Sequence, residues 1–204
     1  MRVRLLSELI DGLDRLRDTW LRNGMPHTNW LRPGLSARRV RDSLGAAGLT
    51  VPREIVEWYS WHDGAEHCLV DGVDGRGAGF LPWFSLDEGL AARTFFLEWA
   101  ESEREAGMPG QSEYDVRFDD NWLPLLNLPA TFGILSPDVE LVRVASTTPG
   151  VDPDEDGAQA SCLAELVGDW TQIVEDYCTW DRAAGVWVYD FEQVPLALRR
   201  RSIL

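Results

Sequence analysis

The stretch VPREIVEWYSWHDG, residues 51–64, marks its own start and end as a helix. Pro52 suits the first helical turn, where its missing N–H removes no hydrogen bond. Apolar residues then recur at helical spacing, at Ile55, Val56 and Tyr59. Gly64 can adopt the left-handed conformation that closes many helices, and His62 can cap the last carbonyls. The sequence therefore predicts a capped core helix over residues 52–62.

Three further motifs follow this helix in a fixed order. They are FLPWFSLDE at 80–88, NWLPL at 121–125 and the helical segment 161–177. Together with residues 51–64 they resemble the SUKH superfamily, which groups bacterial toxin-immunity proteins with regulators of cell-wall synthesis. The resemblance covers residues 35–181, although 128–133 reads LPATFG where the family usually has a Gly-Asp pair. It implies a SUKH-like fold and a protein that binds and blocks a toxin.

The length of 204 residues suits one domain. We expect an N-terminal helical extension over 1–34, a family-like core over 35–181, and a C-terminal strand and tail over 182–204. The first helix is amphipathic, and Glu8 and Asp11 interrupt what would otherwise resemble a signal peptide. No stretch is long and apolar enough to span a membrane. The three cysteines are odd in number and lack CxxC spacing, which fits a reduced, cytoplasmic setting.

The remaining pattern predicts helices and strands in separate runs. We expect helices over 3–23, 36–47, 86–106 and 161–177, and strands within 66–84 and over 122–127, 132–136, 139–145 and 186–189. In the helix over 86–106, the predicted buried stripe is Ala92, Phe95, Phe96, Trp99 and Ala100. Such an order favours an α+β fold with a mainly antiparallel sheet flanked by helices.

Negative charge is concentrated in one part of the chain. Residues 101–181 hold eighteen acids and three arginines, which accounts for the whole net charge of −15. A field of this sign repels nucleic acid and anionic membranes and attracts basic proteins. The charge alternatively serves only solubility. The segregation favours a surface that faces a basic partner.

Aromatic residues beside this charge are candidate anchors for such a partner. Trp122 directly follows the carboxylates of Asp119 and Asp120, and Trp61 lies near the end of the first helix discussed above. A further acidic segment contributes Asp152, Asp154 and Asp156. The alternative for Trp122 is a core residue at the start of a strand.

The acidic segment 152–157, DPDEDG, also matches the first half of an EF-hand calcium loop. The second half does not match, because Leu163 occupies the position that should supply a bidentate Glu. A solvated acidic loop is the better interpretation. We therefore expect neither a metal ion nor another cofactor.

The sequence also lacks an evident catalytic constellation. The three histidines, His27, His62 and His67, do not combine with a cysteine or a serine motif into a nucleophile–base pair. Cys162 and Cys178 lie in apolar helical surroundings and are expected to be buried small hydrophobes. The resemblance then implies a non-enzymatic immunity protein that occludes a cognate toxin, for example a basic nuclease. A regulatory scaffold or adaptor that binds cellular proteins is the alternative.

Overall fold

The computed structural model describes residues 2–65, 83–106, 120–126, 131–135, 140–146, 159–184, 186–189 and 191–198. Within them the helices are α1 (Arg2–Asn23), α2 (Ala37–Ala46), α3 (Arg53–Trp61), α4 (Leu86–Ala106) and α5 (Leu163–Tyr177), with short 3₁₀ turns η1 (Pro26–Asn29) and η2 (Phe191–Gln193). The strands are β1 (Leu31–Pro33), β2 (His62–Ala65), β3 (Trp122–Leu126), β4 (Thr131–Ile134), β5 (Arg143–Ser146), β6 (Gln159–Ala160), β7 (Cys178–Asp181) and β8 (Val186–Tyr189).

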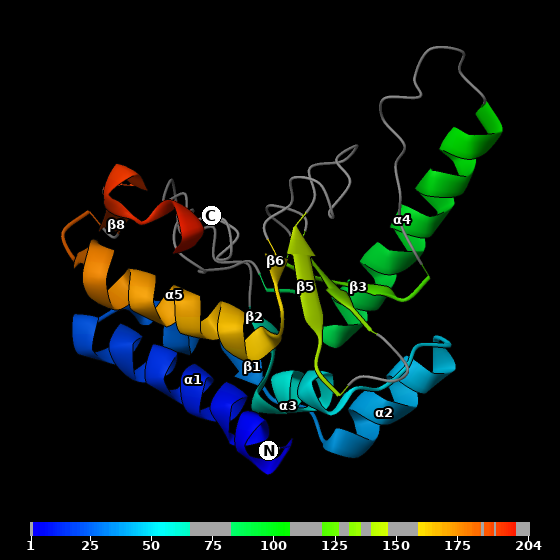
Figure 1. The fold of residues 1–204 in the computed structure, drawn as a ribbon, viewed down its shortest axis with the longest axis horizontal. Helices are drawn as coiled ribbons and strands as arrows, with labels where there is room; N and C mark the ends of the chain where they lie inside the picture. Colours follow the sequence, from blue (N-terminus) through cyan, green and yellow to red (C-terminus); the bar gives the residue numbers. More distant parts are fainter. Residues whose placement is uncertain are drawn as a thin grey trace.

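The described strands pair antiparallel throughout, which confirms the predicted α+β class. They form a four-stranded sheet in the order β3-β4-β5-β6 and two two-stranded sheets, the hairpin β7-β8 and the pair β1-β2, whose strands are separated by α2 and α3. Helices α1 and α5 lie side by side at one end of the molecule, and α4 packs on β3 at the other (Figure 1).

Local sequence explains where the helices begin. The Ser36 hydroxyl accepts a hydrogen bond from the backbone N–H of Arg39, so it caps α2 as predicted. The Cys162 sulfur accepts from the backbone N–H of Glu165 at the start of α5. Pro52 is the residue before α3, where no helical N–H is required of it.

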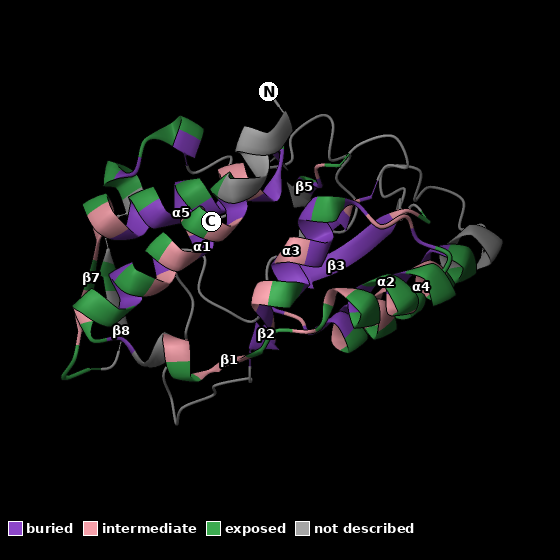
Figure 2. Cartoon of the chain, turned by 90° about the horizontal axis from the view of Figure 1, so that it is seen from below, coloured by how far each residue is buried: buried purple, intermediate pink, exposed green. Residues whose placement is uncertain are grey.

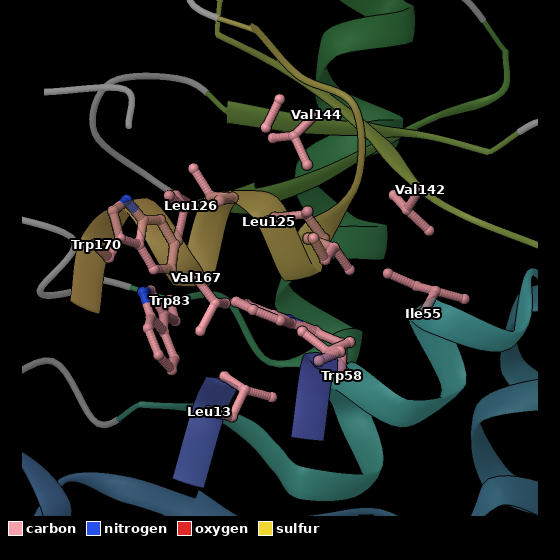
Figure 3. Packing of buried hydrophobic residues seen from close by; sticks show 14 of the residues in the cluster. Leu13, Ile55, Trp58, Trp83, Leu125, Leu126, Val142, Val144, Val167 and Trp170 are labelled. Carbon is pink, nitrogen blue, oxygen red and sulfur yellow. The ribbon is translucent and has the colours of Figure 1, made fainter. Parts of the chain in front are cut away.

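One buried cluster joins α1, α3, α5 and the four-stranded sheet (Figures 2 and 3). At its centre the rings of Trp83 and Trp170 stack with centroids 5.7 Å apart, and Trp58 lies 5.2 Å from Trp83. These three side chains are at most 1% exposed. Trp20 and Trp122 are buried as well, so these five tryptophans build the core rather than a surface.

A buried carboxylate connects three of these elements. Glu54, in the first turn of α3, is 1% exposed. Its Oε2 accepts from the backbone N–H of Val142 at 2.6 Å, and its Oε1 accepts from that of Ala164 at 2.9 Å. Ala164 lies in the first turn of α5, where backbone N–H groups lack helical partners. Glu54 thus caps a helix that is 110 residues away in the sequence.

The sequence misplaced some features. The pattern does not predict β1, β2, β6 and β7. β1 and β6 have only three and two residues, and β2 and β7 continue directly from the ends of α3 and α5, so the apolar spacing of the helix obscures them. His62 does not cap carbonyls with its ring, because Nδ1 accepts from the backbone N–H of Gly64 inside the core. Gly64 does have a positive φ of 72°, but it lies in β2 rather than at the helix end.

Candidate partner-binding surface

Only part of the predicted acidic surface lies within the described residues. Asp120 is exposed in the turn before β3, and its carbonyl accepts a hydrogen bond from the Arg93 guanidinium of α4. This contact places Asp120 beside the middle of α4. Asp119, Asp152, Asp154 and Asp156 lie outside the described residues, and so does the candidate calcium loop.

The two tryptophans proposed as anchors differ in their exposure and in their contacts. Trp122 is 4% exposed and packs with Ala100 of α4, so the core alternative is correct and its ring is not available to a partner. Trp61 is half-buried, and its Nε1 donates to Asp14 of α1 at 3.0 Å. Trp61 therefore contacts α1 through its indole N–H.

The predicted buried stripe of α4 is correct at Ala100 but wrong at Phe95, which leaves an apolar surface exposed. Phe95 is 62% exposed, and Trp99 and Ala92 are only half-buried. The face that packs inward combines Ala100 with Leu86 and Gly89, which the prediction did not include. Since α4 carries apolar residues around most of its circumference, periodicity alone could not say which side is buried.

Acidic side chains border the exposed apolar face of α4. Asp87, Glu98 and Glu101 are all exposed. At 100° per residue Asp87 and Glu98 lie on the flank next to Phe95 and away from Ala100, whereas Glu101 lies further round the helix from Phe95. Asp87 is bound to Arg39 of α2 at 3.2 Å, a surface ion pair that leaves it largely accessible. An aromatic surface with an acidic edge is therefore present on α4, whereas Arg93, which binds the Asp120 carbonyl, lies on the opposite side of the helix from Phe95.

A surface pocket of about 570 Å³ lies between α1 and α5. Arg15 and Arg22 line it, and both guanidinium groups bind the carboxylate of Glu175, which also accepts from the Thr19 hydroxyl. The hydrogen bond from Arg15 lowers the pKa of Glu175. Because Glu175 already neutralises one cation and sits between the two, the pocket is a poor anion site.

The described titratable groups do not combine into a reactive centre. Burial raises the pKa of the Cys178 thiol to about 12 and also raises that of Cys162, so neither is a ready thiolate nucleophile. Burial lowers the pKa of His62 to about 3, which keeps its ring neutral. Among the described residues, His, Cys, Asp and Glu side chains do not gather in groups of three or more that could hold a metal.

Comparisons with known proteins leave the family open. The fold defines an α+β protein, built of small antiparallel sheets flanked by helices. No protein-family model matches the chain, and no curated protein matches it. In the described part of the chain, no helix is both long and apolar enough to cross a membrane.

Proposed function

We propose that this protein is a non-enzymatic immunity protein, which binds a basic toxin in the cytoplasm of the cell that produces it and blocks the toxin's active surface. The order of the sequence motifs supports this class. The observation that carries the proposal is the segregation of charge, because residues 101–181 hold all of the net charge of −15.

The proposed mechanism is occlusion. A nuclease toxin must present Lys and Arg side chains to hold phosphate groups. The exposed carboxylates of Asp120, Glu98 and Glu101 would compete for such side chains. Complementary charge mainly accelerates encounter and suppresses wrong partners, which is what an inhibitor of a lethal enzyme requires.

The test begins with recovery of the basic partner from the native host by affinity capture at low salt. The partner is then expressed alone and together with this protein in a heterologous host. Immunity predicts growth arrest with the partner alone and normal growth on co-expression. Co-expression with a variant in which Asp119 and Asp120 are replaced by Lys should restore growth less well.

The same experiment distinguishes immunity from the alternative function, that of a regulatory scaffold or adaptor. An adaptor's partner would not arrest growth when expressed alone, and its activity would not fall on binding. That result would overturn the immunity proposal while leaving a protein-binding role.

A further inference from the structure

Helix α4 presents an exposed ridge that the core does not use. Ala91, Phe95 and Ser102 are exposed, and Ala92 and Trp99 are half-buried. These residues recur three and four positions apart, so they lie on one side of the helix. The ring of Phe96, which contacts both Phe95 and Trp99 with centroids 5.6 and 6.4 Å away, supports the aromatic pair from beneath.

The ridge stands where a partner can reach it. In Figure 1, α4 projects from the body of the molecule, and its inward side is fixed by β3. Gly89 makes that attachment close, because a Cβ at this position would lie 2.7 Å from the carbonyl oxygen of Pro124. With 21 residues α4 is about 30 Å long at 1.5 Å per residue. It therefore offers an extended helical surface for a partner.

We infer that the α4 ridge docks a basic amphipathic helix of the partner protein. Phe95 and Trp99 would insert between the apolar side chains of that helix, as ridges pack into grooves. Asp87 and Glu98 would face its Lys or Arg side chains along one edge. The inference rests on the proposed function and adds the docking element and the kind of structure that it recognises.

Charge favours a basic helix, rather than a second copy of the chain, as the structure that covers the ridge. A second α4 would bring the same acidic edge, and an antiparallel pair would place the two edges on the same side of the contact. Each copy also carries a net charge of −15. Like charges placed opposite one another disfavour such a pair. A helix with a basic edge meets the same apolar ridge without that repulsion.

The two parts of the surface have separate kinetic roles. Aromatic side chains at the centre of a contact usually hold most of the binding free energy, which sets the dissociation rate. Charges at the rim act mainly on the association rate. Changing Phe95 should therefore alter how long the complex lasts, and changing Glu98 should alter how fast it forms.

The experiment uses a fluorescent peptide of leucine and lysine whose leucines recur at helical spacing, and a scrambled peptide of equal composition. Binding of both is measured by anisotropy with the full-length protein. The amphipathic peptide should bind at least about tenfold tighter than the scrambled one, and Phe95→Ala should weaken it about tenfold, as expected of an anchor residue. Leu21→Ala is the matched control, because Leu21 is 54% exposed on α1 at the other end of the molecule (Figures 1 and 2).

Unchanged thermal midpoints for both variants would show that the fold is intact, since both side chains are mostly exposed. Equal binding of the two peptides, or no effect of Phe95→Ala, would overturn the inference. A dimer in sedimentation that Phe95→Ala dissociates would overturn it in favour of a second copy. If salt-dependent capture of the native partner survives these failures, the proposed function stands without the docking helix. If the peptide binds as expected but co-expression does not protect, only the proposed function fails.

Discussion

At the scale of single residues, the side chain of Glu54 has consequences far from its own helix. Burial raises its pKa, although backbone N–H groups of Val142, Ala164 and Leu163 act in the opposite direction. The core tolerates this buried carboxylate because these backbone N–H groups donate hydrogen bonds to it. A sequence pattern could not predict this role, since the partners lie 88 and 110 residues away.

Replacing Glu54 by Ala should therefore destabilise the protein strongly. Buried N–H groups would lose their acceptor, and each such loss costs about 1–3 kcal/mol. We expect the free energy of unfolding to fall by about 3 kcal/mol or more in urea denaturation. Glu57→Ala on the same helix removes an i,i+4 pair with Arg53 and should cost less than about 1 kcal/mol. Similar losses for the two variants would contradict the capping role of Glu54.

His62 makes stability depend on pH. Its pKa of about 3 in the folded protein lies below the ordinary value near 6.5, so the unfolded chain binds the extra proton between these limits. The contribution of His62 is thus fully present above pH 6.5 and is lost as the pH falls toward 3. Glu54 has the opposite effect near its own raised pKa, since the folded state then binds the extra proton.

Between pH 7 and 5 we therefore expect the free energy of unfolding to decline, with a slope approaching about 1.4 kcal/mol per pH unit from this one group. In His62→Asn the amide oxygen can still accept from Gly64, but nothing titrates at this position. Chemical denaturation at several pH values should give a flatter profile for that variant. An unchanged slope would show that another group causes the decline.

At the scale of elements, the sequence predicted where helices lie better than how they face. The predicted bounds of α4 agree with the structure, and the helix predicted over 161–177 corresponds to α5. The orientation of α4 was missed because both of its sides are apolar. For Trp122 too, the sequence does not show which way the side chain faces, because an aromatic residue beside two carboxylates fits both a core strand position and a surface anchor.

The contact of α4 with β3 can be tested with glycine substitutions. In Gly89→Ala the new Cβ would meet the Pro124 carbonyl oxygen at 2.7 Å, so the helix must shift from the strand. Such overpacking typically costs about 1–3 kcal/mol. Gly168→Ala in α5 meets nothing within 4 Å and should instead stabilise by about 0.5–1 kcal/mol. Thermal unfolding in which Gly89→Ala is as stable as Gly168→Ala would contradict the close packing.

At the scale of the whole molecule, the segregated charge is the feature that the sequence revealed most directly. Net charge is a sum over residues and requires no fold to be read. The sequence could not show that exposed acidic side chains border an aromatic ridge, because this depends on which side of α4 packs against β3. The core tryptophans and the Glu54 cap likewise depend on contacts between distant segments.

The central claim is that this surface captures a basic partner, and the association rate of that partner as a function of ionic strength tests it most directly. Surface charges are screened over about 8 Å at physiological salt, so the rate should fall steeply as salt rises. Replacing Asp119 and Asp120 together by Lys should slow association several-fold and flatten the salt dependence. Replacing Glu8 and Asp11, which are exposed on α1 outside the acidic span, should have much less effect. A rate indifferent to salt, or equal losses in the two double variants, would contradict the claim.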